Sequence, residues 1–397
     1  MKKLDKEIWI VAAKRTPFGA LSGALKSVSA IDLAVHASKA ALEQAKLDGS
    51  ELGHVVLGNV QQTSADAIYG ARHVGLKAGV PVEVPALTLN RLCGSGFQAV
   101  ITAAEQVLLG EANAVLAAGS ENMSMAPHVL FGLRDGAKFG RPPQLVDSLW
   151  EALTDSFCKT PMAITAENLA EKYGITREQA DAFALSSQKR WAAAQESGGF
   201  SDEIAAIEVS AGRKTLKVER DEHPRPDASM EALAKLSPVF KKDGVVTAGN
   251  ASGISDGAAA LVVADAVWAK GRGLTPLAKL VGWGVAGVEP TLMGIGPAPA
   301  IRTALSRTGI QLDAVDLFDV NEAFAPQFLA VQKELGLPDD KTNVNGGAIA
   351  LGHPLGASGA RITANLVYTL RKKKKKLGVG AACIGGGQGI AVVLESC

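Results

Sequence analysis

Two parts of this chain repeat each other at a spacing of 263 residues, and this repeat constrains the fold more than any other feature. The matching pairs are Leu42 with Leu305, Ser95-Gly96 with Ser358-Gly359, and residues 115–119 with residues 378–382. One such pair would be chance, but three pairs at one spacing indicate a duplicated α/β unit. The repeat sets Gly356 opposite Cys93 and Cys383 opposite Ser120. The two halves therefore share a turn and differ in the chemistry that they place there.

Apolar runs of strand length alternate along the chain with amphipathic stretches of helix length. Strands are expected at residues 8–13, 55–60, 86–89, 114–119, 315–320 and 378–382, and helices at residues 30–45 and 97–109. This alternation indicates βαβ units and a mostly parallel sheet. The 43 glycines, against 5% aromatic residues, favour a fold with many tight turns and close backbone approaches.

Charge and hydropathy exclude several classes of protein. A net charge of +1, from 41 Lys+Arg and 40 Asp+Glu, gives no field that would steer the chain onto nucleic acid or an anionic membrane. No apolar run reaches the roughly 18 residues of a membrane-spanning helix, and the strand at 8–13 leaves no room for a signal peptide. We therefore expect a soluble protein that is not secreted.

The cysteines indicate neither a disulfide framework nor a metal site. The chain has four cysteines, Cys93, Cys158, Cys383 and Cys397, too few in 397 residues for a disulfide framework, which favours a reducing compartment. They form no CxxC pair and have no His at a zinc-ligand spacing, so a structural metal site is not expected. The glycine run at 385–387 lacks the GxxxxGK[ST] pattern, and no GxGxxG follows a strand, so nucleotide binding is not expected.

Residues 122–250 differ from both halves in composition and pattern. They begin with a proline-rich stretch, continue with a helical segment at 166–195 and include a polar run at 212–226. We interpret them as an insertion that forms a separate lid or binding domain. The first half then comprises residues 1–121 plus about 251–273, and the second half residues 274–397.

Residues 371–376 are one Arg followed by five Lys. Such a run either binds phosphate or an anionic partner, or forms the solvated C-terminal end of a helix, where cations suit the helix dipole. We favour the second interpretation, because it needs no partner.

Cys93 lies in a turn that suits a nucleophile. The segment Asn90-Arg91-Leu92-Cys93-Gly94-Ser95-Gly96 stands between a predicted strand and a predicted helix. Unpaired N–H groups and the dipole at such a helix N-terminus favour a thiolate. The alternative is a buried, inert cysteine, but the strand-Cys-Gly-x-Gly-helix context favours the nucleophile.

His353 and Cys383 occupy matching positions in the second half. His353 precedes the helix that repeats the Cys93 helix, and a pseudo-twofold axis would bring both helix N-termini to one centre. There an imidazole can take the thiol proton or donate to an oxyanion. Cys383 precedes a glycine run whose backbone N–H groups suit an oxyanion hole. Taken singly, His353 is more typical of a turn residue, and Cys383 fits a small core residue as well.

Three further residues give weaker signals. Asn321 follows a predicted strand and can hold a water or an oxyanion, or merely form an Asx turn. Ser252, within a Gly-Asn-Ala-Ser-Gly segment, and Arg225, within His-Pro-Arg-Pro, are candidate ligand contacts. For each of these residues alone, a structural role is the stronger interpretation.

Together these segments resemble the thiolase family over essentially the whole chain. The matching blocks, in the family's order and spacing, are residues 13–19, 92–96, 249–253, 321–324, 352–354 and 383–387. The resemblance implies an α/β fold with duplicated βαβαβαββ halves in a five-layer α/β/α/β/α core, and residues 122–250 as a loop domain over coenzyme A. It also implies a homotetramer, a dimer of dimers, that uses acyl-CoA and coenzyme A as substrates without a metal or a permanently bound cofactor.

The resemblance further implies roles for individual residues. Cys93 would be the acylated nucleophile, His353 its activating base and Cys383 the second acid/base. Asn321 would hold a catalytic water, and the backbone N–H groups of Cys93 and Gly385 would form a second oxyanion hole. The remaining matches are Ser252 and Arg225 at coenzyme A contacts, and Met162, Met293 and Phe324 in the acyl pocket.

Within the family, residues 148–150, 153–155 and 160–163 are most similar to mitochondrial-type 3-ketoacyl-CoA thiolases of fatty acid β-oxidation. Biosynthetic acetoacetyl-CoA thiolases typically have His-Met-Gly where this chain has Pro161-Met162-Ala163, which disfavours a purely acetoacetyl-specific role. The resemblance implies reversible thiolytic cleavage through an acyl-Cys93 intermediate, with acyl-CoA hydrolysis as a side activity. It implies the mitochondrial matrix in a eukaryote and the cytoplasm otherwise.

Three alternatives are weighed against this hypothesis. One is an acetoacetyl-CoA thiolase that acts mainly in synthesis. Another is a decarboxylating ketoacyl synthase, which shares the duplicated fold but usually lacks a second catalytic cysteine, so Cys383 argues against it. The third is a carrier of acyl-CoA or lipid without turnover, which has no need of two thiols facing one imidazole.

Overall fold

The computed structural model describes residues 4–397, and its core is a ten-stranded sheet. The strand order is β14-β15-β16-β13-β1-β12-β5-β3-β4, with β2 paired to β12 beside this path. The first half contributes β1 (Ile8–Arg15), β2 (Gly19–Ala20), α1 (Ala30–Ala45), β3 (His54–Gly58), α2 (Gly70–Lys77), β4 (Ala86–Leu89), α3 (Ser95–Leu109), β5 (Ala114–Asn122), β12 (Ser255–Asp265) and α8 (Ala266–Gly271). The predicted bounds of α1 and β4 agree with the structure.

The second half repeats this order of elements. It contains β13 (Ala278–Gly287), α9 (Pro297–Thr308), β14 (Leu317–Val320), α10 (Ala325–Leu335), α11 (Ala348–Leu351), α12 (Leu355–Lys372), β15 (Leu377–Ile384) and β16 (Gln388–Ser396). Strands β14 and β15 begin 263 residues after β3 and β5, which confirms the duplication. The counterpart of β4 is reduced to one isolated bridge, between Phe318 and Thr342.

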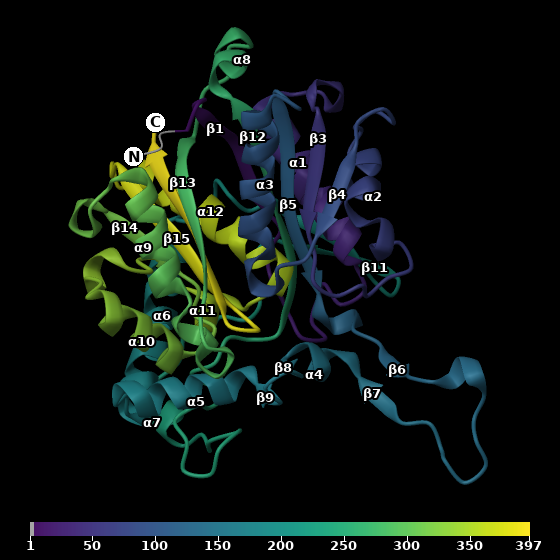
Figure 1. Ribbon diagram of the computed structural model, residues 1–397, viewed down its shortest axis with the longest axis vertical. Helices are drawn as coiled ribbons and strands as arrows, with labels where there is room; N and C mark the ends of the chain where they lie inside the picture. Colours follow the sequence, from purple (N-terminus) through teal and green to yellow (C-terminus); the bar gives the residue numbers. More distant parts are fainter. Residues whose placement is uncertain (1–3) are drawn as a thin grey trace.

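The elements stack in five layers, as the family resemblance implies (Figure 1). Helices α3 and α12 form the middle layer: α12 packs against β5 and β12 of one half and against β15 and β14 of the other. Helices α1 and α2 cover the outer face of the first half, and α9 and α10 lie outside the second. Within residues 4–397, the two halves of the sheet are joined where Ile8–Ile10 pair with Ala278–Leu280.

The two middle helices touch at their N-termini through glycines that the repeat relates. A Cβ atom on Gly96 would lie 2.4 Å from the backbone nitrogen of Ala360, and one on Gly359 would lie 2.2 Å from that of Phe97. Both contacts are with backbone, which a side-chain rotation cannot relieve. These reciprocal contacts are those of a pseudo-twofold axis, and they bring the segments before both helices to one centre.

Gly359→Ala is expected to destabilise the protein by about 3 kcal/mol, the upper end of the usual cost of overpacking, because the contact is with backbone and forces the two helices apart. The measurement is the midpoint of thermal unfolding. Gly271→Ala is the matched control, since a Cβ on this helical glycine meets nothing within 4 Å. An unfolding midpoint of Gly359→Ala equal to that of the control would show that the helices can separate without cost.

Helix α3 is apolar because it is a core helix. Residues 92–109 have the length and composition of a membrane-spanning segment, contrary to our expectation that no run would reach that length. In the fold, α3 lies between the two halves of the sheet, packed against β5, β3 and α12. Most of its apolar side chains therefore contact protein, although Leu109 at its end is exposed.

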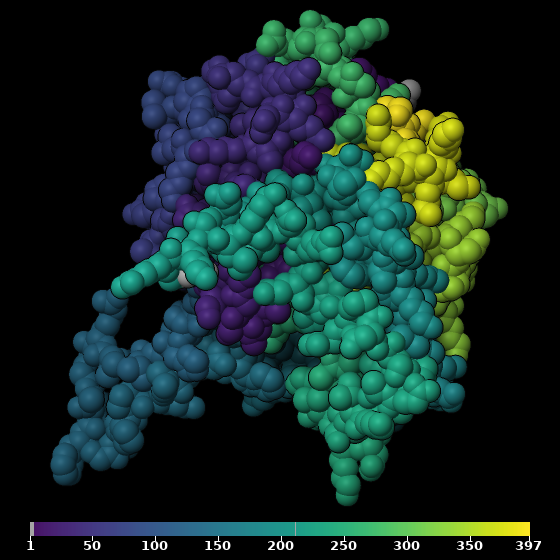
Figure 2. All heavy atoms as spheres, turned by 180° about the vertical axis from the view of Figure 1, so that it is seen from behind, coloured from purple at the N-terminus to yellow at the C-terminus, as the bar shows by residue number. Residues whose placement is uncertain are grey.

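The insertion between β5 and β12 forms its own small elements. They are β6 (His128–Leu130), β7 (Leu145–Asp147), α4 (Ser148–Ala152), β8 (Thr154–Asp155), β9 (Thr160–Pro161), α5 (Met162–Tyr173), α6 (Arg177–Glu196), β10 (Ile207–Ala211), β11 (Lys214–Val218) and α7 (Met230–Ala234). Figure 2 shows inserted residues spread over one face of the molecule, while the β6–β7 segment projects away from it. The helical segment predicted at 166–195 consists of two helices: Gly174, in a left-handed conformation, ends α5, and the capping box of Thr176 and Gln179 begins α6.

Buried ion pairs fasten the insertion to the core. The guanidinium of Arg15, at the end of β1, donates to Glu203 at 2.6 Å and to Asp221 at 2.6 Å and 2.9 Å. All three side chains are fully buried. The block 13–19 therefore has a structural role here, since it anchors two distant parts of the insertion.

The basic run at 371–376 lies at the end of α12 that is remote from His353. Helix α12 ends at Lys372, and the run is exposed up to Lys376. Arg371 donates to the carbonyls of Leu277 and Cys397, among others. This is the predicted solvated end of a helix, with cations close to its last carbonyls.

Candidate active site

Cys93 stands on a tight turn between β4 and α3. Leu92, immediately before it, has a φ of 47°, which is rare for a residue with a branched side chain and marks local strain. The Ser95 hydroxyl donates to the Leu92 carbonyl at 2.7 Å and accepts from the Arg91 N–H at 2.9 Å. A Cβ on Gly94 would lie 2.6 Å from the Ile384 side chain. The turn is thus fixed by short bonds and by the close approach of β15.

His353 lies in the loop between α11 and α12, and both ring nitrogens have partners. Its Nδ1 is 2.6 Å from the Ser358 hydroxyl, and its Nε2 is 3.3 Å from the Asn321 side-chain nitrogen. The Ser358 hydroxyl also donates to the Pro354 carbonyl at 3.0 Å, so it accepts from Nδ1–H. This network assigns the proton to Nδ1 and leaves Nε2 as the basic nitrogen.

The backbone around His353 also constrains its position. The His353 N–H donates to the Gly253 carbonyl at 2.9 Å, which ties the loop to the segment that contains Ser252. Gly352 has a φ of 95°, and a Cβ there would lie 2.0 Å from the Ser255 hydroxyl. Only glycine fits this position, because both the backbone conformation and the space exclude a side chain.

Cys383 is the penultimate residue of β15, and it is fully buried beside Met293 and Ala323. The strand ends in a turn whose Gly385 N–H is hydrogen-bonded to the Cys93 thiol. Burial raises the pKa of Cys383, and a charge on the neighbouring Cys93 raises it further. The ends of β4 and β15, one from each half, therefore meet at these two sulfurs.

One apolar cavity of about 170 Å³ collects most of the predicted site residues. Its lining contains Cys93, His353 and Cys383 together with Ser252, Met162, Met293 and Phe324. Gly385 borders it through its hydrogen bond to Cys93, and Asn321 through its contact with His353. Arg225 is not brought to this cavity: it is exposed, and its backbone N–H bonds Gln188 at 2.9 Å.

Burial dominates the state of the Cys93 thiol. It raises the pKa of Cys93 to about 11, assisted by the charge of Glu121 and opposed by the N–H groups of Gly385 and Cys93 itself. The backbone N–H groups favour the thiolate, the direction that the turn predicts, but desolvation of the charge outweighs them. Cys93 rests as a thiol and needs a base.

The other two groups of the site are also neutral at rest. Burial, with the charge of Arg361, lowers the pKa of His353 to about 3, so its Nε2 can accept a proton at neutral pH. Burial raises the pKa of Cys383 well above that of a free thiol. Two thiols and one unprotonated imidazole thus share an apolar space, an arrangement suited to transferring protons.

Some residues of the cavity were not predicted. Leu153 and Phe240 reach it from the insertion, and Met123 and Leu355 complete the wall. No local pattern marks these four, since the tertiary fold alone brings them together. Ser358 was noted only as the opening of a helix, and its spacing of five residues from His353 is the signal that could have revealed the ring contact.

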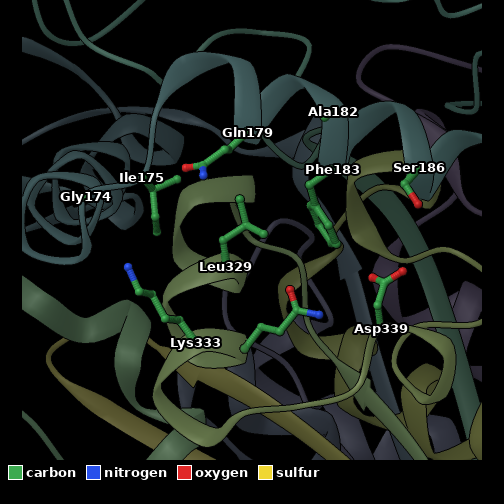
Figure 3. Close-up of a pocket in the computed structure, with 10 residues that line it drawn as sticks. Gly174, Ile175, Gln179, Ala182, Phe183, Ser186, Leu329, Lys333 and Asp339 are labelled. Atoms are coloured by element: carbon green, nitrogen blue, oxygen red, sulfur yellow. The ribbon is translucent and has the colours of Figure 1, made fainter.

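A second, larger depression of about 520 Å³ lies between α6 and α10. Figure 3 shows Phe183 and Leu329 facing each other across it, with Lys333 and Asp339 at its edge. Lys333 donates to the Tyr173 carbonyl, and Asp339 pairs with Arg190. Neither a cysteine nor a histidine is among the residues that line it, so the smaller cavity is the candidate site. Among residues 4–397, no group of three or more His, Cys, Asp or Glu is placed to bind a metal ion.

Comparisons with known proteins agree with this geometry. Residues 8–266 match the thiolase N-terminal domain and residues 274–396 the thiolase C-terminal domain. The chain is 55% identical to the human mitochondrial 3-ketoacyl-CoA thiolase and 48% identical to the acetyl-CoA acetyltransferase of Pseudomonas aeruginosa, each alignment covering 98–99% of both chains. The crystal structure of human mitochondrial 3-ketoacyl-CoA thiolase in complex with CoA superposes with a TM-score of 0.97 at 54% identity, covering 100% of this chain and 99% of that one. The chain belongs to the thiolase family.

Proposed function

We propose that this protein is a 3-ketoacyl-CoA thiolase, an acyltransferase that cleaves a 3-ketoacyl-CoA with coenzyme A into acetyl-CoA and a shortened acyl-CoA. The observation that carries this proposal is the joint position of Cys93, His353 and Cys383 on one apolar cavity. The greater similarity to the mitochondrial 3-ketoacyl-CoA thiolases than to the bacterial acetyl-CoA acetyltransferases supports the choice of substrate.

In the first half-reaction the Cys93 thiol gives its proton to Nε2 of His353, and the sulfur attacks the 3-keto carbon. The C2–C3 bond of the tetrahedral adduct then breaks, and its electron pair becomes the enolate of acetyl-CoA. Cys383 gives its proton to C2. The products are acetyl-CoA and an acyl-Cys93 thioester, an intermediate that divides one difficult step into two.

In the second half-reaction the Cys383 thiolate takes the proton of coenzyme A, whose sulfur attacks the acyl carbon. Cys93 leaves and recovers its proton from His353, so every group returns to its initial state. Attack by water on the same thioester would give the acyl-CoA hydrolase side activity. Ping-pong kinetics follow from this order.

Two sets of donors serve the oxyanions. We assign the N–H groups of Cys93 and Gly385 to the tetrahedral adducts, since the Gly385 N–H is directed at the Cys93 sulfur. We assign the enolate oxygen to protonated His353 and to a water that accepts from or donates to Asn321, whose side-chain oxygen has no partner within the described chain. A single donor of this kind is worth about 3–4 kcal/mol in a transition state.

The remaining assignments concern binding and assembly. We propose Met162, Met293 and Phe324 as the acyl pocket, Ser252 and Arg225 as coenzyme A contacts, and residues 122–250 as the domain that covers coenzyme A. Leu153 and Phe240 support this, because the insertion supplies them to the cavity wall. We also propose a homotetramer, located in the mitochondrial matrix in a eukaryote or in the cytoplasm of a bacterium.

The test is intact-protein mass spectrometry after mixing with 3-ketooctanoyl-CoA, combined with thiolysis rates on acetoacetyl-, 3-ketohexanoyl- and 3-ketooctanoyl-CoA. We expect a hexanoyl adduct on Cys93, formed from 3-ketooctanoyl-CoA. We also expect a higher kcat/KM for the two longer substrates than for acetoacetyl-CoA. Activity confined to acetoacetyl-CoA would instead identify an acetyl-CoA acetyltransferase. Tight binding without any adduct or cleavage would identify a carrier.

A further inference from the structure

A buried ion pair joins the same two elements that hold the catalytic imidazole. Ser358, the partner of His353 Nδ1, lies on α12, and Asn321, the partner of Nε2, directly follows β14. One helical turn after Ser358 is Arg361, and two residues before Asn321 is Asp319. Their side chains approach to 3.4 Å and are 1% and 6% exposed.

The spacing on both elements places this pair beside the two ring contacts. Residues three apart on a helix lie on one face, as Ser358 and Arg361 do. Alternate residues of an extended strand point to one side, as Asp319 and Asn321 do. The Asn321 N–H donates to the Ala381 carbonyl at 2.8 Å, so the strand geometry continues through Asn321.

The pair is poorly suited to stabilise the fold. Arg361 Nε and Nη2 and one Asp319 oxygen have no hydrogen-bond partner within the described chain. A buried ion pair recovers its desolvation cost only when its remaining donors and acceptors are satisfied. The position of the Arg361–Asp319 pair between α12 and β14 is better explained by a role in holding the geometry of the site.

We propose that Arg361 is a positioning residue, which fixes the separation of α12 from β14 and thereby the orientation of the His353 ring between Ser358 and Asn321. The inference rests on the proposed thiolysis, in which His353 is the base. Arg361 does not touch substrate; it acts through Asp319 and the two ring contacts.

The cation also acts on the ring through its charge, since Arg361 lowers the pKa of His353. Cys93 and Cys383 line the cavity together with the ring, and the charge of Glu121 acts on Cys93. The charge of Arg361 acts on the carboxyl groups of Asp319, Glu322 and Glu203. Removing the cation should therefore let His353 take a proton at higher pH, and the base form should be lost first on the acidic side.

The test compares the double variant Arg361→Met/Asp319→Asn with wild type in single-turnover acylation of Cys93 between pH 5 and 8. Wild-type cleavage of 3-ketooctanoyl-CoA is measured first, so that a failure of the proposed function is seen separately. We expect a wild-type acylation rate that is nearly level down to pH 5. For the double variant we expect at least a 10-fold lower rate at pH 7.5 and a steeper fall toward pH 5 than in wild type, because loss of the cation raises the pKa of His353 while burial still holds it below the ordinary value.

Arg361→Lys provides a second test if the double variant does not fold. Lysine keeps the charge but not the planar fork, so we expect a level pH profile and a rate at least 10-fold lower, with kcat affected more than KM. Thr363→Val is the control on the same helix, because its hydroxyl bonds only the Gly359 carbonyl of α12. Wild-type rates and pH profile in a folded double variant, or a wild-type rate in Arg361→Lys, would overturn the proposal.

Discussion

Cys93→Ala is expected to abolish acyl-enzyme formation and to lower kcat for thiolysis by at least about 10⁴-fold, since removal of a covalent nucleophile costs up to about 10⁶-fold. The residual activity would come from the oxyanion donors and binding alone. The fold should persist, because the turn is held by Ser95 and Gly94 rather than by the thiol. The measurement is the intact mass after mixing with acyl-CoA, together with the thermal unfolding midpoint.

Cys158→Ala is the matched control for this substitution. Cys158 is a partly exposed cysteine of the insertion and does not line the cavity, so its loss should leave the adduct and the rate unchanged. If the acyl adduct persisted in Cys93→Ala and disappeared in Cys158→Ala, Cys158 would be the nucleophile. A folded Cys93→Ala protein with wild-type turnover would remove covalent catalysis by Cys93 altogether.

The core fold could be predicted from the sequence, because the repeat and the local hydrophobic patterns indicate the same helices and strands. Helix α1 has the bounds that its amphipathic pattern predicts, and in the structure Ser29 caps it by accepting from the Asp32 N–H. The meeting of Cys93 with His353 was predictable because Gly96 and Gly359 stand at equivalent points of the two halves. The pseudo-twofold symmetry thus brings the Cys93 and His353 motifs, which are remote in sequence, to one site.

Properties that depend on tertiary packing were not predictable in the same way. The break between α5 and α6 depends on the left-handed conformation of Gly174, which an otherwise helical pattern conceals. The resting thiol of Cys93 depends on burial by β15 and on Glu121, neither of which is adjacent to it in sequence. The wall supplied by Phe240 depends on how the insertion folds back, for which no periodicity is present.

Cys383→Ser is expected to slow the cleavage and formation of the C2–C3 bond while leaving the acylation of Cys93 by a thioester intact. A serine hydroxyl is a much weaker acid than a thiol, so protonation and deprotonation of C2 should slow by about 10²–10⁴-fold, the usual contribution of a positioned acid/base. Acylation of Cys93 by a simple acyl-CoA should survive, because coenzyme A is a good enough leaving group to depart as a thiolate when Cys383 is not there to protonate it, whereas a carbanion at C2 is not. The measurements are thiolysis of 3-ketooctanoyl-CoA, condensation of acetyl-CoA, and the adduct mass with acetyl-CoA.

The contrast between these measurements distinguishes a second acid/base from a core residue. Cys383 is fully buried beside Met293 and Ala323, so a purely structural serine defect would lower the unfolding midpoint and weaken acylation and carbon chemistry together. Cys397→Ser is the control, since this exposed cysteine lies outside the cavity and its replacement should change neither. Condensation at the wild-type rate in Cys383→Ser would show that C2 receives its proton from another group. Because burial by both halves keeps Cys383 protonated at rest, the thiol is the group of the cavity best placed to supply that proton while His353 retains the one from Cys93.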